Sequence, residues 1–220
     1  MLKSRKGGVY MANQIYTIGR EFGSGGKYVG EELAKRLGIK LYDKDLLQKA
    51  AKESGFCEEI FQNHDEKPTS SFLYSLVMDT YSANGYSTAS FLDMPLNHKV
   101  FLAQFETIKK IAENESCVIV GRCADYALAN HPNCINVFVK ANMDYRIKLV
   151  SKRSNLTESK AKDMILKQDK QRASYYNYYT SKKWGDSKSY DLCLDSSKLG
   201  IDGCVDMILK FKEIIDAGNK

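Results

Sequence analysis

The chain has 220 residues, a length that suits one compact α/β domain rather than several. Hydrophobic residues make up 43% of the sequence, enough for a sizeable core, and no run of 18 apolar residues occurs that would predict a membrane span. The net charge of +6 is moderate. It suits a cleft for polyanionic small molecules as well as it suits a nucleic-acid surface.

The amino-terminal residues 1–13 are basic but lack the apolar segment of a secretory signal. We expect them to form a disordered tail before a single domain at residues 14–220. The six cysteines form no CxxC pair, and their spacing fits neither a zinc site nor a disulfide scaffold. We therefore expect reduced cysteines in a cytoplasmic protein, with core positions for Cys117, Cys134 and Cys193 in their apolar runs.

Apolar runs and amphipathic segments alternate along the chain. The runs predict strands at residues 14–18, 39–43, 117–121 and 135–141 and within residues 189–197. The periodic segments predict helices at residues 27–38, 44–55, 98–116 and 200–218, and two more that begin near Asn142 and after Thr157. Residues 56–97 contain short helical pieces and no clear strand, which predicts an inserted helical subdomain. Alternating strands and helices predict a parallel sheet with right-handed crossovers.

The segment GREFGSGGKY, residues 19–28, lies between the first predicted strand and helix. Its glycines let the backbone turn sharply, and the amino end of a helix offers free N–H groups and a positive dipole end to an anion. A Walker A loop has Lys directly after its last Gly and then Ser or Thr, whereas Tyr28 follows Lys27 here. The segment predicts either an atypical phosphate loop or a glycine-rich turn without a ligand.

Two further features could bring arginines to a phosphate. Arg122 follows a buried predicted strand, at the edge of the sheet where α/β proteins bind ligands, although it could instead pair with Asp125. Asp169 and Arg172 are three residues apart and therefore share one face of a predicted helix. The basic residues around them fit either a solvated helix face or a mobile lid over a transferring phosphoryl group.

The run YYNYYTSKKW, residues 175–184, combines tyrosines with lysines. Such a run could bind nucleic acid by base stacking, or it could pack the helix against a neighbour. Because no continuous basic stripe accompanies it, we expect packing by Tyr175, Tyr178 and Tyr179 and no nucleic-acid binding.

Taken together, these features resemble the cytidylate kinase-like family of P-loop nucleoside monophosphate kinases, from about Ile15 to Ile215. The stretches that carry the resemblance are TIGREFGSGGKYVGEELAKRLG, LYDKDLL, DEKPTSSFLYSL, VIVGRCADY, DKQRASYYNYYTSKKWGD and YDLCLDSSKLGID. The resemblance implies a three-layer, P-loop NTPase-like α/β fold with a five-stranded parallel sheet flanked by helices. It also implies a helical NMP-binding insertion at residues 56–97 and a lid at residues 153–188.

The activity that the resemblance implies is ATP-dependent phosphoryl transfer to a nucleoside monophosphate, CMP or dCMP first, with Mg²⁺ bridging the ATP phosphates. Its partners would be nucleotide substrates, with neither nucleic acid nor a membrane. The family's loop Lys aligns with Gly26, and the Asp before its Gly-Arg pair is Val120 here. Two alternatives therefore stay open, a regulatory nucleotide-binding protein with little turnover and a kinase for another small acceptor. The metal ligands and the oligomeric state are not predicted.

The resemblance also implies roles for single residues. Those expected on the ATP phosphates are Gly23, Ser24, Gly25, Gly26, Lys27 and Tyr28. Those expected to act on the transferring group are Lys27, Arg153 and Arg172. Those expected to contact the acceptor are Arg20, Asp43 and Arg122. Those expected in the lid are Arg146, Asp169 and Arg172.

Overall fold

The structure, a computed structural model, describes residues 13–43, 46, 49, 52 and 95–218. Five strands form one sheet in the order β2-β3-β1-β4-β5, and every neighbouring pair is parallel. The strands are β1 (Ile15–Arg20), β2 (Lys40–Tyr42), β3 (Cys117–Val120), β4 (Cys134–Lys140) and β5 (Leu192–Asp195). The five-stranded parallel sheet predicted from the sequence is confirmed.

The predicted helices that the structure describes appear in the predicted order, with ends shifted by a few residues. The helices are α1 (Gly26–Leu37), α6 (Leu96–Asn114), α7 (Ala124–Ala127), α8 (Met143–Ser154), α9 (Glu158–Thr180), the 3₁₀ helix η1 (Ser187–Ser189) and α10 (Ser196–Gly218). The two short ones, α7 and η1, were not predicted. The caps agree with the sequence signals: the Asn142 and Thr157 side chains each accept a backbone N–H three residues on. Most of the predicted tail, of the helix at 44–55 and of the insertion at 56–97 lies outside the described residues.

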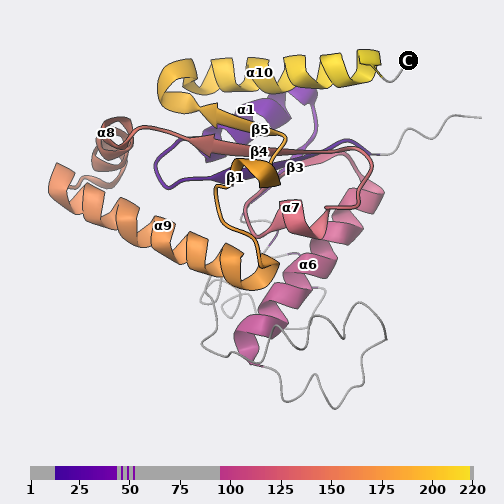
Figure 1. The fold of residues 1–220 in the computed structure, drawn as a ribbon, viewed down its shortest axis with the longest axis horizontal. Helices are drawn as coiled ribbons and strands as arrows, with labels where there is room; N and C mark the ends of the chain where they lie inside the picture. The colour runs from indigo at the N-terminus through magenta and orange to yellow at the C-terminus, as the bar shows by residue number, and fades with distance from the viewer. Residues whose placement is uncertain (1–12, 44–45, 47–48, 50–51, 53–94, 219–220) are drawn as a thin grey trace, which may run out of the picture.

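Helices cover the sheet on both faces, which makes three layers (Figure 1). On one face, α1 and α10 pack a core that includes Val29 and Ile208 against the sheet. On the other face, α6 and α7 contribute Ile108 and Ala124 to a second core. A parallel sheet buried on both faces reads as continuous apolar runs, which is why β3 was predictable as a strand.

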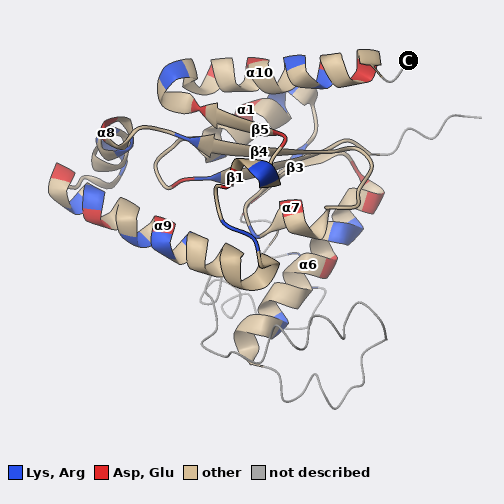
Figure 2. Ribbon diagram, viewed as in Figure 1, with Lys and Arg blue, Asp and Glu red and all other residues tan. Residues whose placement is uncertain are grey.

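Helix α9 docks on α6 through aromatic rings. Tyr179 stacks on Phe101, with ring centroids 4.0 Å apart and planes 12° from parallel, and Tyr175 meets the same ring edge-on. Both tyrosines are buried. This packing confirms the predicted role of the tyrosine run, and Lys and Arg in Figure 2 alternate with acidic residues along α9 instead of forming one stripe.

One expectation about the cysteines is wrong. Cys193 is exposed and Cys134 is half-buried, whereas Cys117 is buried as predicted. Cys193 lies on β5, one of the two edge strands of the sheet, where one side of the strand has no neighbouring strand. All five cysteines in the described part of the chain are free thiols. None of the helices in that part is both long and apolar enough to cross a membrane.

Candidate active site

The glycine-rich loop connects β1 to α1 at the carboxyl edge of the sheet. Gly25 precedes the helix with φ 78°, a left-handed conformation that glycine adopts without strain. A Cβ on Gly26 would lie 2.5 Å from the Cβ of Arg20, so this position admits no larger residue without movement of β1. Helix α1 therefore begins directly at the loop, and the N–H groups of its first turn have no partner within the helix.

Serine side chains support the loop from inside the protein. The Ser24 hydroxyl is fully buried and donates to the Glu21 carbonyl oxygen over 2.9 Å. Ser196, which follows β5, donates its hydroxyl to the Ser24 carbonyl oxygen. The Ser24 hydroxyl is thus engaged with the backbone of the loop itself. Tyr28, by contrast, lies at the surface of α1 and is 38% exposed.

Three charged side chains meet where β2 and β3 end and α1 begins. The Asp43 carboxylate, just after β2, lies 3.3 Å from the Lys27 ammonium nitrogen and 3.3 Å from Arg122 Nη1. Arg122 is buried and also donates to the Val120 carbonyl oxygen over 3.1 Å. The pairing of Arg122 with Asp125, which the sequence left open, is not seen: Asp125 instead accepts the Tyr176 hydroxyl over 2.7 Å.

Helices α8 and α9 hold the start of the loop. The Asp169 carboxylate accepts the Phe22 N–H over 2.7 Å and pairs with Arg146. Arg146 is buried, donates to the Phe22 carbonyl oxygen over 2.8 Å and lies 3.3 Å from the Glu21 carboxylate. The guanidinium of Arg146 is therefore engaged by the loop and by α9. Two residues expected in a lid, Arg146 and Asp169, act here as a clamp on the loop backbone.

The Phe22 ring lies against two arginines expected at the transferring group. The guanidinium carbon of Arg153 is 5.2 Å from the ring centroid, and that of Arg172 is 5.4 Å from it. Arg172 also donates to the Arg20 carbonyl oxygen over 3.3 Å. Asp169 and Arg172 thus contact the same loop from one helix face, as their spacing predicted.

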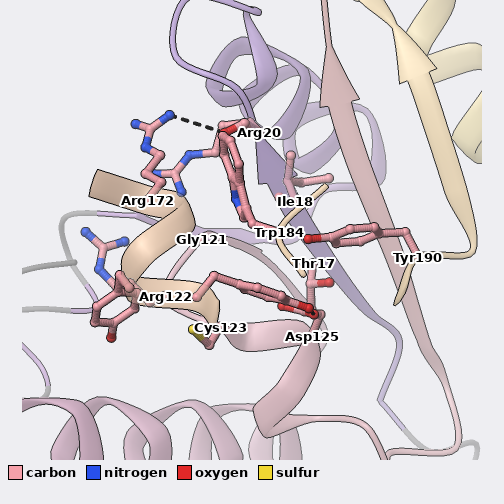
Figure 3. Close-up of a pocket in the computed structure, with 13 residues that line it drawn as sticks. Thr17, Ile18, Arg20, Gly121, Arg122, Cys123, Asp125, Arg172, Trp184 and Tyr190 are labelled. Carbon is pink, nitrogen blue, oxygen red and sulfur yellow. Dashed lines mark hydrogen bonds between the residues drawn. The ribbon is translucent and has the colours of Figure 1, made fainter. Parts of the chain in front are cut away.

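A pocket opens beside the loop, between the sheet and α9 (Figure 3). The space among its lining residues is about 360 Å³ when the open solvent at its mouth is counted, and the cavity itself is about 20 Å³. Its lining comes from β1, the turn after β3, α9 and the connection to β5, and consists of Thr17, Ile18, Gly19, Arg20, Gly121, Arg122, Cys123, Asp125, Arg172, Tyr175, Tyr176, Trp184 and Tyr190. Burial raises the pKa of the Asp125 carboxyl above its ordinary value and also raises the pKa values of Tyr176 and Tyr190.

The turn after β3 shapes one wall of this pocket. Gly121, Arg122 and Cys123 follow one another with φ values of 79°, 55° and 55°. Left-handed conformations are uncommon in residues other than glycine and cost conformational energy. The fold holds Arg122 in such a conformation, which turns its side chain toward Asp43.

Several side chains of this region were not singled out by sequence reasoning. Glu21 receives the Ala141 N–H over 3.0 Å, and Phe22 and Ser196 make the loop contacts described above. Phe22 had a usable signal, an aromatic residue inside a glycine-rich loop. Trp184 and Tyr190 lie in stretches that carry the family resemblance, but the sequence did not place them at the pocket, because the connection that contains them is remote from β1 along the chain.

Residues 15–198 match the model of the protein family described as "Cytidylate kinase-like family". The chain belongs to the cytidylate kinase-like family. No curated protein matches the sequence. An uncharacterized protein from Eubacterium ventriosum is 34% identical over 90% of this chain and 98% of its own, with a TM-score of 0.68. The predicted family and its P-loop kinase fold are thereby confirmed.

A more distant structure supports the same fold for this family member. Shikimate kinase from Bacteroides thetaiotaomicron is 13% identical, with 91% of this chain and 98% of that chain covered and a TM-score of 0.53. At this identity the likeness shows the fold alone.

Proposed function

We propose that this member of the cytidylate kinase-like family transfers the γ-phosphoryl group of ATP to a small phosphorylated acceptor, with CMP or dCMP as the first candidate. The observation that carries the proposal is the loop from Gly23 to Gly26, a glycine cradle at the amino end of α1 with arginines beside it. An anion is favoured there because N–H groups without a partner inside the helix and the helix dipole both attract negative charge.

The loop residues fit the phosphates of ATP. The N–H groups of the cap residue Gly25 and of Gly26, Lys27 and Tyr28 in the first turn of α1 are the donors that would hold them. In this structure the Gly26 N–H donates to Ser24 Oγ over 3.4 Å, a contact that it would exchange for a phosphate oxygen. Lys27 is half-exposed beside the loop, so its ammonium group can leave Asp43 to reach a phosphate. ATP supplies the transferable phosphoryl group, and Mg²⁺ neutralises charge on its oxygens.

If Mg²⁺ binds with ATP, few side chains of this protein are placed to coordinate it. Within the described residues, no three His, Cys, Asp or Glu side chains gather as a metal site. Magnesium ions at such sites keep several waters and use one or two carboxylates in addition to phosphate oxygens. Asp43 is the carboxylate nearest to Lys27 and is the residue that would contribute, in place of the absent loop hydroxyl.

The arginines would act on the other side of the transferring group. Arg172 and Arg153 are held on Phe22 of the loop, from where they would reach the transferring phosphoryl group, and residues 153–188 would form the lid that carries them. Arg122 and Arg20 would contact the acceptor. Positioning and positive charge supply most of the catalysis of phosphoryl transfer, and an acceptor phosphate is already ionised, so no general base is required.

A nucleotide-binding protein with negligible turnover is the second candidate. Tyr28 stands at the position of the loop hydroxyl, and Lys27 is paired with Asp43 and lies 3.7 Å from Glu31. Both features would weaken catalysis more than binding. A kinase for another small acceptor is the third candidate, and it differs from the first only in what the acceptor side recognises.

A coupled phosphotransfer assay over all ribo- and deoxynucleoside monophosphates separates these candidates. We expect turnover with CMP or dCMP above the other acceptors, and a large loss of ATP binding and turnover in Gly26→Ala because of the clash with Arg20. Gly218→Ala is the matched control, since a Cβ there meets no heavy atom within 4 Å. Stabilisation by ATP without turnover on any acceptor would favour the second candidate over the first.

A further inference from the structure

The junction between β5 and α10 lies against the phosphate loop. In Figure 1, β5 leads directly into α10, which packs beside α1 over the same face of the sheet. Ser196 is the first residue of α10 and is 1% exposed, and its hydroxyl donates to the Ser24 carbonyl oxygen. The two residues are 172 positions apart in the sequence, so the contact exists only in the folded chain.

The Ser196 hydroxyl is itself held in place by the sheet. Its oxygen lies 3.2 Å from the carbonyl oxygen of Lys140, the last residue of β4, and closer to the carbonyl oxygen of Ser24. A hydroxyl carries a single hydrogen, so the shorter contact with Ser24 is the stronger one. Ser196 therefore connects the loop to the carboxyl ends of two strands, β4 and β5.

The peptide group between Ser24 and Gly25 determines the effect of this contact. The group is trans, so it is planar, and its carbonyl oxygen and its N–H point in opposite directions. Because Ser196 holds the carbonyl oxygen on the buried side of the loop, the Gly25 N–H faces the opposite, outer side. Among the described residues, the Gly25 N–H has no hydrogen-bond partner. It is therefore a donor that an anion at the loop can use.

Gly25 does not fix this orientation by itself. Its φ of 78° is left-handed, and glycine adopts positive and negative φ about equally well, so the peptide plane before it can rotate at little conformational cost. A residue with a side chain would restrict this rotation, but a Cβ at Gly25 would lie 2.8 Å from Ile201 Cδ1. The packing of α10 thus requires glycine here, and the orientation depends on a contact from outside the loop.

We infer that Ser196 is a positioning residue for the phosphate loop: its hydroxyl holds the Ser24–Gly25 peptide in the orientation that presents the Gly25 N–H to a phosphate of ATP. This role rests on the proposed function and adds to it a residue that lies outside both the glycine loop and the lid. Ser196 acts through the backbone and does not touch ATP. Loss of its hydroxyl should therefore weaken contacts with the phosphate chain and leave contacts with the acceptor unchanged.

Calorimetric titration of the full chain with ATP and, separately, with tripolyphosphate tests this role. Tripolyphosphate carries the phosphate chain without the nucleoside, so it reports on the loop alone. Ser196→Ala is expected to weaken the binding of both by about tenfold, the effect of one hydrogen bond to a charged group. In steady-state kinetics the KM for ATP should rise by a similar factor, while the acceptor KM changes less than twofold.

Two serine variants provide the controls. Ser196→Thr keeps a hydroxyl at the same position and should restore most of the affinity. Ser197→Ala removes the hydroxyl of the next residue, which contacts Asp195 and Asn142 instead of the loop, and should leave ATP and tripolyphosphate binding within twofold of the unmodified protein.

A spectroscopic measurement tests the orientation without any variant. Labelling with ¹⁵N-glycine reduces the amide spectrum to the 15 glycines of the chain, which makes the Gly25 signal resolvable. Saturation with tripolyphosphate should move this signal, because the Gly25 N–H gains an acceptor. The Gly38 signal should stay in place, since its N–H already donates to α1 carbonyl oxygens at the far end of the helix. A Gly25 signal that does not move at saturation would overturn the role given to Ser196.

The outcomes separate the role of Ser196 from the proposed function. Tripolyphosphate binding that Ser196→Ala weakens, without phosphotransfer in the unmodified protein, would support the role and overturn the kinase. Phosphotransfer with a KM for ATP that Ser196→Ala leaves unchanged would overturn the role and support the kinase. An equal rise in both KM values in Ser196→Ala would assign Ser196 to general stability and also overturn the role.

Discussion

Two clusters of ionic contacts, each centred on one arginine, behave differently in this protein. Arg146 is buried between the phosphate loop and α9, where it meets Glu21, Asp169 and the Phe22 carbonyl oxygen. Arg36 lies on the outside of α1 and pairs with three carboxylates, one on α1 and two on α10, which are Glu32, Asp202 and Asp206. The inner cluster joins the loop to α8 and α9, whereas the outer cluster only adds to an existing helix contact.

The two clusters differ because water reaches the contacts of Arg36 more than those of Arg146. Water screens the exposed pairs of Arg36, and such pairs contribute little to the free energy of unfolding. The inner arginine has lost most of its hydration, so each contact that remains must compensate for that loss. The same amino acid therefore serves as a surface contact at Arg36 and as an organiser of the candidate site at Arg146.

The largest effect is expected from removing one partner of the inner cluster. Asp169→Ala leaves Arg146 buried beside one carboxylate fewer and removes the acceptor of the Phe22 N–H. We expect a loss of about 3 kcal/mol in the free energy of unfolding, measured by urea denaturation. Asp169→Asn keeps an acceptor oxygen and should lose less. A loss below 1 kcal/mol in the alanine variant would show that the two clusters do not differ as described.

The second prediction concerns how the free energy of unfolding depends on pH. His98 is buried, and desolvation lowers its pKa from 6.5 to about 4. The unfolded chain therefore binds the proton first, so stability is intact above pH 6.5 and falls as the pH drops toward 4. At pH 5 we expect a loss of about 2 kcal/mol relative to pH 7, from 1.36 kcal/mol per pKa unit. His98→Phe should abolish this difference between the two pH values, and an equal loss in that variant would assign it to other groups.

The third prediction concerns the ring that joins the loop to two arginines. Phe22→Leu keeps an apolar side chain but removes the surface on which Arg153 and Arg172 lie. We expect about 1 kcal/mol of destabilisation and a larger fractional loss in kcat than in ATP affinity, because the arginines would lose their positions at the transferring group. Steady-state kinetics with thermal unfolding measures both effects. An unchanged kcat would contradict the role given to Phe22.

The smallest effect is expected at the outer cluster. Arg36→Gln removes three surface ion pairs at once. We expect less than 1 kcal/mol of destabilisation, further reduced in high salt, because exposed pairs are screened. A loss as large as that of Asp169→Ala would remove the distinction between the clusters.

Sequence patterns predicted the elements of the fold well because those patterns are local. Continuous apolar runs indicated β3 and β4, helical periodicity indicated α6, and Asn142 and Thr157 indicated the starts of α8 and α9. The spacing of Asp169 and Arg172 placed them on one helix face, and the structure has both on the loop. These features depend only on residues that are close to one another in the sequence.

What the sequence could not decide was which distant groups meet. The position of β5 at the sheet edge exposes Cys193, and the order β2-β3-β1 brings Lys27, Asp43 and Arg122 together. Trp184 and Tyr190 reach the pocket only because α9 crosses beside β1. The sequence by itself determined the alternation of strands and helices, the glycine loop and the family. The tertiary structure decided which arginine is buried, which is stacked and which lines the pocket, because those properties depend on the order of the strands and on the path of α8 and α9.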